Sequence, residues 1–354
     1  MFMDTRELGT SGVEVSTVGF GAWVVGTDWW GDRSEQQAIE MLRHGFDRGV
    51  TYVDTSDVYG HGRSEELVGR AIEGRREEVT LGTKVGYDFY NNPQAGHGEL
   101  PKEPGLDYLR QAFERSLARL DTDYVDLLQL HNFDAEEVTP EILAWLDELR
   151  DENRIRATGW ALGPSIGWLE EGTSAVRHEF DVVQTVYNMF EQVPGRQFIE
   201  AIRDRESGTS LMARVPHSSG LLNEQVTPET ELGAGDHRGH RPQAWFEAGW
   251  EKLDNVRFLE AGGDRTMAQA SIQWLLSHPE LATVTPTFRT KDDIDAWAGA
   301  PDTPVLTAEE QERVEALYQQ NFGVERDDGM HPEQFRTSVG GRDLEEAGLV
   351  SRAD

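Results

Sequence analysis

Short apolar runs alternate with helical patterns along most of this chain, and this alternation constrains its fold more than any other feature. Eight runs rich in β-branched residues are separated by segments in which apolar residues recur with helical spacing. Strands that alternate with helices form a parallel sheet with right-handed crossovers. The eight predicted strands span residues 15–23, 50–55, 78–85, 124–131, 155–162, 180–188, 209–217 and 281–289.

Four intervening segments carry helix signals. Ser34 is the expected N-cap of a helix over residues 34–49, and Gly49 ends that pattern. Thr139 precedes a proline at the first helical position of residues 139–152, which is a favoured place for proline. Residues 63–74 and 106–120 follow the same helical pattern.

Eight strands alternating with helices predict an α/β fold of the (β/α)₈ TIM-barrel type. A doubly wound sheet is the alternative, and it calls for a G-x-G-x-x-G fingerprint after the first strand. Residues 19–26 read GFGAWVVG, which does not fit that fingerprint and leads into a Trp-rich loop. We expect one barrel domain over residues 1–320 and a C-terminal extension over residues 321–354.

Composition excludes several classes of site and partner. The 354 residues include no cysteine, which excludes disulfides, zinc-thiolate sites and cysteine nucleophiles. No stretch approaches the ~18 apolar residues of a membrane-spanning helix, and we expect neither a signal peptide nor a membrane partner. No basic run is present, so we expect no nucleic-acid partner.

The chain is strongly acidic. It has 65 acidic and 33 basic residues, for a net charge of −32. Four of the basic residues are lysines, which leaves 29 arginines. High salt screens self-repulsion, with a Debye length of about 3 Å at 1 M. Acid excess together with scarce lysine predicts a halophilic, cytoplasmic protein, and an ordinary acidic soluble protein is the alternative.

Polar side chains stand where three of the predicted strands end. Asp54 ends the second strand, Lys84 the third and His131 the fourth, and Tyr59 follows Asp54 by five residues. The carboxyl ends of the strands form the active-site face of a (β/α)₈ barrel. Taken one at a time, each residue has a structural alternative. Asp54 could be a turn residue, Tyr59 a half-buried aromatic, and His131 a core histidine with its hydrogen bonds satisfied. Lys84 is harder to explain in this way, because it ends an apolar strand in a chain with four lysines.

Together, the four residues make a proton donor for a carbonyl group. A tyrosine is a weak acid with a reference pKa of about 10, and a neighbouring ammonium stabilises its phenolate. A buried ammonium needs a counter-charge, which Asp54 would supply. A histidine at the adjacent strand end can bond and orient a carbonyl oxygen. The set has no nucleophile for the carbonyl carbon, so a cofactor or second substrate must provide one.

The segments around these residues resemble the aldo-keto reductases. DTSDVYGHGRSEELVGRAI is similar to the second-strand motif of that family, LLQLHNFD to its histidine strand, and VVQTVYNMFEQ and TVTPTFRT to its sixth and eighth strands. TRELGTSGVEVSTVGFGAW resembles its N-terminal β-hairpin and first strand, and the similarity runs in order over residues 4–320. It implies a hairpin before the barrel, long loops at the C-terminal face, no metal, and hydride delivery from a nicotinamide nucleotide. It also implies that Asp54, Tyr59, Lys84 and His131 are catalytic, with Tyr59 as the general acid.

The resemblance implies a cofactor site with some departures from the family pattern. Gln184 matches the glutamine that holds the carboxamide, but residues 159–162 read GWAL where the family usually has a Ser-Asn pair. Arg214 stands where a tyrosine commonly stacks on the ring, and a guanidinium is also planar. The other implied contacts are Gly21, Ala22, Trp23 and Asp54, then Val215, His217 and Ser219 at the pyrophosphate, and Thr287, Phe288 and Arg289 at a 2′-phosphate.

Arg289 suits a 2′-phosphate because a guanidinium is a bidentate donor. We therefore expect NADP as the cofactor, with NAD possible because Asp293 and Trp297 occupy positions that often carry a basic residue and an asparagine. The alternative role for Arg289 is a surface helix start.

Three long connections follow the strand pattern, over residues 87–105, 218–243 and from 321 onwards. Loops of such length are usually lids or disordered. Asp236-His237-Arg238 in the second connection could belong to a belt over the cofactor or bind nothing. Trp23, Trp29, Trp30 and His61 could wall a substrate pocket or form a structural aromatic cluster.

The sequence supports an NAD(P)-dependent oxidoreductase that reduces an aldehyde, ketone or sugar carbonyl as its first hypothesis. A non-catalytic nucleotide-binding barrel, acting as a sensor or regulatory subunit, is the alternative. A metal-dependent sugar isomerase is less well supported, because most strand ends carry Thr, Leu, Asn or Arg instead of carboxylates and histidines. The expected partner is a small carbonyl or alcohol substrate.

Overall fold

A nearly closed barrel of eight parallel strands forms the body of the protein. The computed structural model describes residues 3–27, 33–92, 100–163, 168–233 and 236–324. The strand order is β10-β9-β8-β7-β6-β5-β4-β3, and a parallel bridge between Val18 and Val284 joins the two edges. The predicted TIM-barrel fold is confirmed. The strands are β3 (Phe20–Gly21), β4 (Tyr52–Asp54), β5 (Thr80–Val85), β6 (Leu127–His131), β7 (Ala157–Ala161), β8 (Val182–Val186), β9 (Ser210–Arg214) and β10 (Leu281–Thr285).

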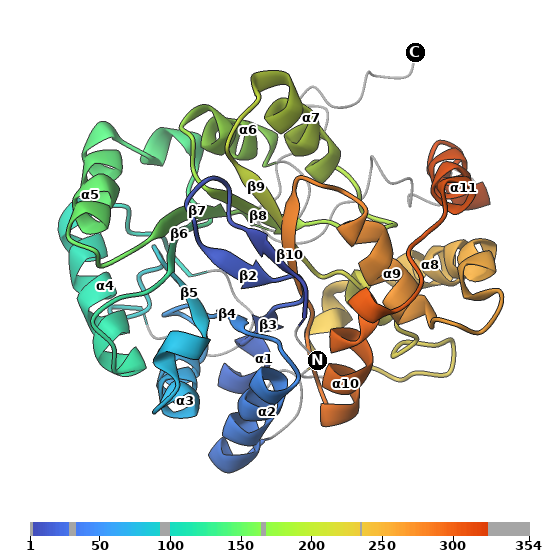
Figure 1. Cartoon of the computed structure of the whole chain (residues 1–354), viewed down its shortest axis with the longest axis horizontal. Helices are drawn as coiled ribbons and strands as arrows, with labels where there is room; N and C mark the ends of the chain where they lie inside the picture. Colours follow the sequence, from blue (N-terminus) through green and yellow to red (C-terminus); the bar gives the residue numbers. More distant parts are fainter. Residues whose placement is uncertain (1–2, 28–32, 93–99, 164–167, 234–235, 325–354) are drawn as a thin grey trace.

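Helices surround this barrel (Figure 1). The two predicted N-cap residues are confirmed. Ser34 forms a capping box with Gln37 at α2, and the Thr139 hydroxyl accepts a hydrogen bond from the Ile142 amide at α5. The α-helices are α1 (Trp23–Gly26), α2 (Glu35–Asp47), α3 (Arg63–Ile72), α4 (Leu106–Leu120), α5 (Pro140–Asp151), α6 (Leu169–Arg177), α7 (Gly195–Arg205), α8 (Gln243–Val256), α9 (Met267–Leu276), α10 (Lys291–Ala298) and α11 (Ala308–Tyr318). The 3₁₀ helices are η1 (Arg76–Glu78), η2 (Ala135–Glu137), η3 (Ser218–Gly220), η4 (His237–His240), η5 (Arg257–Glu260), η6 (Ala300–Asp302) and η7 (Asn321–Gly323).

The first predicted strand is two separate strands. The run over 15–23 divides into β2 (Glu14–Ser16), which pairs antiparallel with β1 (Thr5–Glu7), and the short barrel strand β3. The Ser16 hydroxyl lies at the division, where it donates to the Val18 carbonyl and accepts from the amides of Thr51 and Tyr52. These bonds turn the chain from the hairpin into the barrel.

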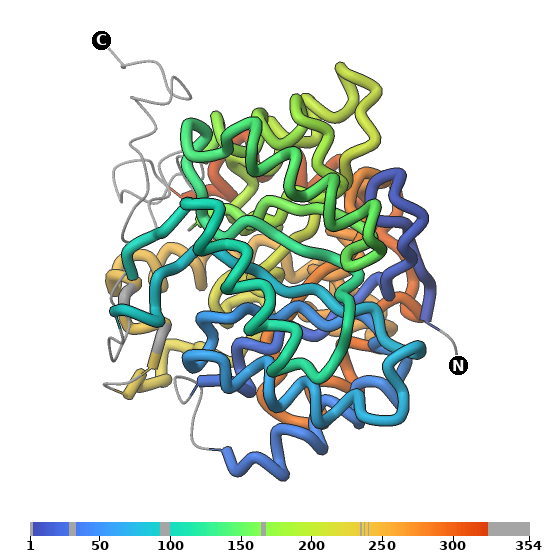
Figure 2. Tube along the Cα trace, turned by 90° about the vertical axis from the view of Figure 1, so that its left-hand side faces the viewer, coloured from blue at the N-terminus to red at the C-terminus, as the bar shows by residue number. Residues whose placement is uncertain are grey.

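The hairpin closes one end of the barrel. Leu8, Val13 and Val15 pack against Tyr52 and against residues from the amino-terminal halves of several barrel strands. The Arg6 guanidinium donates to three carbonyls, those of Leu276 at 2.6 Å, His278 at 3.0 Å and Leu281 at 2.6 Å. Figure 2 shows this hairpin in dark blue on one side of the molecule and the segment after β9 in yellow on the other. The carboxyl ends of the strands are therefore left for a site.

The packed body extends to the end of the described residues. Phe322 is fully buried and contacts Phe190 and Tyr318, and Val324 is also buried. The predicted extension spans residues 321–354. Residues 321–324 are described and pack on the body, whereas residues 325–354 lie outside the described residues, so a separate extension stays a prediction. Among the described helices, none has both the length and the apolar character needed to cross a bilayer.

Candidate active site

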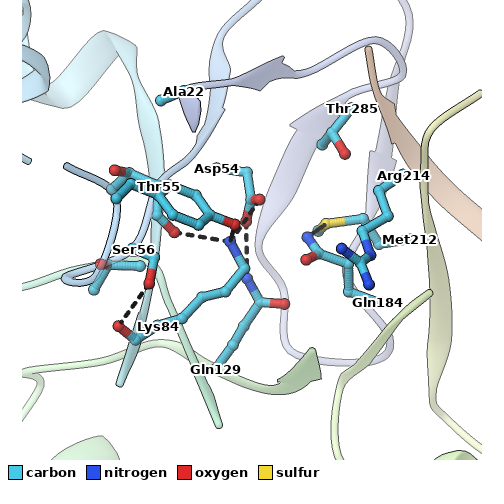
Figure 3. Close-up of polar contacts among 12 residues, drawn as sticks. Ala22, Asp54, Thr55, Ser56, Lys84, Gln129, Gln184, Met212, Arg214 and Thr285 are labelled. Carbon is cyan, nitrogen blue, oxygen red and sulfur yellow. Dashed lines mark hydrogen bonds and ion pairs between the residues drawn. The ribbon is translucent and has the colours of Figure 1, made fainter. Parts of the chain in front are cut away.

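A buried ion pair lies at the carboxyl ends of β4 and β5. The Lys84 ammonium donates to Asp54 Oδ2 at 2.6 Å and to the Thr55 carbonyl at 2.8 Å (Figure 3). Lys84 is fully buried and Asp54 is 5% exposed. The Tyr59 hydroxyl lies 3.4 Å from the same ammonium. The structure thus brings Asp54, Lys84 and Tyr59 together, as the strand-end pattern predicts.

The second oxygen of Asp54 is also held by donors inside the barrel. Gln129 Nε2 donates to Asp54 Oδ1 at 2.9 Å, and the Tyr52 hydroxyl donates to it at 3.2 Å. Glycines on neighbouring strands leave room for these side chains. A Cβ at Gly82 would lie 2.7 Å from the Tyr52 hydroxyl, and one at Gly159 would lie 2.7 Å from Gln129 Cγ. Asp54 is therefore satisfied on both oxygens without water.

Tyr59 is positioned by the turn between β4 and α3. Its ring stacks on Trp23, the first residue of α1, with centroids 5.6 Å apart and planes 15° apart. Glycine is required beside it, because Gly60 has a positive φ and a Cβ there would lie 2.0 Å from the Gly26 carbonyl oxygen. This close backbone contact fixes the tyrosine between α1 and the ammonium.

His131 lies beside Tyr59 at the end of β6. Its ring centroid is 5.9 Å from that of Tyr59 and 4.8 Å from that of Tyr87. Its Nδ1 atom lies 3.1 Å from the Ser56 hydroxyl. Burial, and then the charges of Lys84 and Arg214, lower the pKa of His131 well below 6.5. His131 is therefore neutral at ordinary pH and can orient a carbonyl oxygen by hydrogen bonding.

Gln184 and Arg214 stand across the barrel mouth from Lys84 (Figure 3). Gln184 Nε2 donates to the sulfur of Met212 at 2.9 Å, a weak acceptor that a better one can replace. Arg214 donates through Nη2 to the carbonyls of Leu162 and Gly163, both at 2.7 Å, while its buried Nε has no hydrogen-bond partner in the part of the chain that the structure describes. A carboxamide and a planar group would fit beside these polar atoms.

The segment after β9 has a strained backbone. Val215, Ser218 and Ser219 all have positive φ, of 55°, 46° and 52°, and this is unusual for a β-branched residue such as Val215. Gly220 follows with φ of 99°. His217 is buried against Trp297, where burial lowers its pKa to about 4. Several amides of this segment donate within it, those of Ser218 and Gly220 to the carbonyls of Val215 and His217, so the predicted pyrophosphate contacts of Val215, His217 and Ser219 stay a prediction.

The loop after β10 brings two guanidinium groups close together. Burial, followed by the charge of Arg289, lowers the pKa of Arg33, which also donates to the Arg289 carbonyl at 2.8 Å. Phe288 is fully buried against Phe20 and Trp297, so only its backbone remains for a ligand. Asp293 accepts from the amides of Arg289 and Thr290 and so competes with an anion at the start of α10.

The connection from 218 to 243 is tied to the site by a buried ion pair. Arg241 donates to Glu191 at 3.0 Å and to the Ser219 hydroxyl at 3.2 Å. Asp236 pairs with Arg238 at 2.6 Å in the same connection. His61 stacks on Phe89, away from the ion pair of Lys84, whereas Trp29 and Trp30 lie outside the described residues.

Four residues of this region were not predicted from the residues at the strand ends: Tyr52, Ser56, Gln129 and Arg33. Tyr52 and Gln129 could have been predicted from the sequence. Each precedes a predicted site residue by two positions on the same strand, and residues two apart on a strand point to the same face. Ser56 and Arg33 lie in loops, where spacing carries no such information. Within the described part of the chain, no group of three or more His, Asp or Glu side chains could hold a metal ion.

Comparisons with known proteins agree with this geometry. The family model "Aldo/keto reductase family" matches residues 17–319. The chain is 30% identical over 283 residues to the aldo-keto reductase YhdN of Bacillus subtilis, covering 78% of this chain and 82% of that protein. It is 29% identical to the holo form of an aldo-keto reductase from Bacillus halodurans, with a TM-score of 0.73 and coverage of 89% and 96%. A Klebsiella pneumoniae aldo-keto reductase in complex with NADPH is 25% identical, with a TM-score of 0.64 and coverage of 90% and 96%. These matches do not favour the sensor or regulatory alternative.

Removing one member of the buried ion pair tests its contribution to stability. Lys84→Met leaves the Asp54 carboxylate buried without its cation, so we expect a loss of about 3–5 kcal/mol in the free energy of unfolding. The double variant Lys84→Met/Asp54→Asn removes both charges and should recover much of that loss. The control is Lys291→Met, because Lys291 is half exposed and lies 3.7 Å from Glu40. Denaturant unfolding measures all three. Equal stability of the single variant and the wild type would contradict the structure.

Proposed function

Because the chain belongs to the aldo/keto reductase family and is an NAD(P)H-dependent oxidoreductase, we propose that it reduces an aldehyde, ketone or sugar carbonyl with Tyr59 as the proton donor. The nicotinamide nucleotide supplies the hydride when it is bound. The observation that carries the proposal is the position of the Lys84 ammonium, which contacts both Asp54 and the Tyr59 hydroxyl.

Proton transfer is the part that this chain performs itself. Tyr59 gives its hydroxyl proton to the carbonyl oxygen as negative charge develops there. The ammonium of Lys84 stabilises the phenolate that is left, and Asp54 keeps that ammonium charged and in place. His131 is neutral, so it orients the carbonyl oxygen by a hydrogen bond while Tyr59 donates the proton.

The cofactor would lie across the carboxyl ends of β8 to β10. The proposed contacts around the nicotinamide end are Gln184 and Arg214, together with Gly21, Ala22, Trp23 and Asp54. Val215, His217 and Ser219 are the proposed pyrophosphate segment. At Thr287, Phe288 and Arg289 we propose a 2′-phosphate site in which Phe288 contributes backbone only and Arg33 adds a second cation. NADP is therefore the preferred cofactor, and NAD remains an acceptable one.

The net charge of −32 with four lysines supports a protein that works in a salt-rich cytoplasm. Acid side chains spread over the fold repel one another, and dissolved salt screens that repulsion.

Tyr59→Phe tests the proposed proton donor. The variant keeps the ring that stacks on Trp23 and removes the hydroxyl alone, so we expect the cofactor to bind normally. Single-turnover reduction of a reactive aldehyde, followed at the nicotinamide absorbance, should slow by roughly 10²–10⁴-fold. Tyr124→Phe is the matched control. Tyr124 lies just before β6 begins, at the end of that strand opposite to His131, and its hydroxyl donates to Glu77. An unchanged rate in Tyr59→Phe, with fold and cofactor affinity intact, would refute the role of Tyr59.

Arg289→Ala tests the proposed 2′-phosphate site. Loss of one charged hydrogen-bond partner should weaken NADP binding by about 1.5–3 kcal/mol and leave NAD binding unchanged. Arg205→Ala makes the same change in net charge at an exposed end of α7 and should affect neither cofactor. Fluorescence titration of both cofactors gives the dissociation constants. Equal affinities for NADP and NAD in the wild type, unaltered by Arg289→Ala, would place phosphate recognition elsewhere.

Thermal unfolding across a salt series tests the halophilic assignment. The melting temperature should rise from low salt to several molar KCl, because screening removes repulsion among carboxylates that the fold brings together. Circular dichroism at each concentration provides the measurement. A melting temperature that stays flat or falls as salt increases would rule the assignment out.

A further inference from the structure

A buried serine contacts the histidine of the proposed active site. Ser56 is fully buried, and its hydroxyl oxygen lies 3.1 Å from His131 Nδ1, 3.3 Å from Asp57 Oδ1 and 3.4 Å from the Lys84 carbonyl oxygen. The hydroxyl has one proton, so it can donate to only one of these three acceptors at a time. Which acceptor receives the proton decides the state of the histidine.

Neutral His131 has two tautomers, and the Ser56 contact distinguishes them. If the hydroxyl donates to Nδ1, then Nε2 carries the ring proton and can donate to a carbonyl oxygen. If the hydroxyl donates to Asp57 instead, Nδ1–H donates to Ser56 and Nε2 presents a lone pair. A lone pair would repel a carbonyl oxygen. Nε2 has no hydrogen-bond partner within the part of the chain that the structure describes, so it is available to a substrate.

The charge of Asp57 controls this competition. Asp57 is fully buried, and its Oδ2 atom has no hydrogen-bond partner among the described residues. Burial, reinforced by the charge of Glu65, raises the pKa of Asp57 well above its usual range. A carboxylate would attract the Ser56 proton strongly, whereas a neutral carboxyl competes weakly. The charged and titratable groups that face Asp57 are Glu65 on α3, Tyr108 and Arg119 on α4, Tyr90 in the connection after β5, and, through Ser56, His131 on β6.

We propose that Ser56 is a positioning residue that holds His131 as the Nε2–H tautomer by donating its hydroxyl proton to Nδ1. The proposal rests on the proposed function, since it assigns Nε2–H the task of orienting the carbonyl oxygen. Ser56 acts through His131 and does not touch the substrate. Through Ser56, the buried carboxyl group of Asp57 is linked to His131 at the mouth of the barrel.

The tautomer can be read directly by ¹⁵N NMR of the full-length protein labelled at histidine. The His131 signal is assigned by its loss in His131→Asn. We expect the wild type to show a protonated Nε2 and a bare Nδ1. Ser56→Ala should shift the ratio of the two tautomers by about tenfold towards Nδ1–H, the effect of losing one hydrogen bond. A protonated Nδ1 in the wild type, or an unchanged His131 signal in Ser56→Ala, overturns the proposal.

Asp57→Asn provides an independent variant, because an asparagine has the shape of a neutral carboxyl and cannot ionise. We expect it to keep the Nε2–H signal of the wild type at neutral pH and to retain that signal at alkaline pH, where ionisation of Asp57 converts the wild type towards Nδ1–H. Loss of Nε2–H in Asp57→Asn at neutral pH would show that a charged Asp57 is required, and so overturns the proposal.

Kinetics with NADPH and a reactive aldehyde supply the second readout. Ser56→Ala should lower kcat by about tenfold with little change in the KM for NADPH. Ser174→Ala, which removes a buried hydroxyl on α6, should leave both constants unchanged. Carbonyl reduction by a wild type that carries Nδ1–H would overturn this inference and leave the proposed function standing. The expected NMR pattern in a protein that reduces no aldehyde would support the tautomer assignment and refute the function.

Discussion

The ion pair between Lys84 and Asp54 is the interaction on which the interior of the barrel depends. Taking two charges out of water costs several kcal/mol for each ion, and their attraction offsets that cost only where the remaining hydrogen-bonding positions are filled. Lys84 has the Thr55 carbonyl as well as Asp54, and Asp54 has Gln129 and Tyr52 on its other oxygen. These partners come from three adjacent strands. The site therefore exists only when β4, β5 and β6 are in register.

The same requirement explains why Asp54, Lys84 and His131 stand on strands. Lys84 pairs in register with Gln129, and Asp54 with Gly82, so the ladder sets their spacing before any ligand arrives. Of the four residues Asp54, Tyr59, Lys84 and His131, Tyr59 is the one that reaches the site from a turn, and its position is fixed by the stack on Trp23 and by the close contact of Gly60 with Gly26. A rigid ammonium with a tyrosine held against it needs little rearrangement at the moment of proton transfer.

Strand order and most of the site could be predicted because their signals are local. Most barrel strands lie within runs rich in apolar and β-branched residues, and Asp54, Lys84 and His131 stand at the ends of three of these runs. The division of residues 15–23 was not predictable from apolarity, since both halves are buried, one in the hairpin and one in the barrel. Phe288 shows another limit. Position on a motif indicates that the segment approaches a ligand, but packing decides whether its side chain or its backbone does so.

The chain has to attract an anionic cofactor in spite of its own charge. A net charge of −32 repels a dinucleotide phosphate at long range, and only nearby cations can reverse that potential at the site. In the proposed 2′-phosphate site, the guanidinium groups of Arg33 and Arg289 would be these cations, although Asp293 already accepts from the two amides of Arg289 and Thr290 beside them. Salt weakens the long-range repulsion from the carboxylates and the short-range attraction to the guanidinium groups to different extents. It screens the distant carboxylates strongly, whereas contacts shorter than the Debye length are screened much less. A protein of this composition can therefore gain affinity for an anion as salt rises, the reverse of what a basic protein shows.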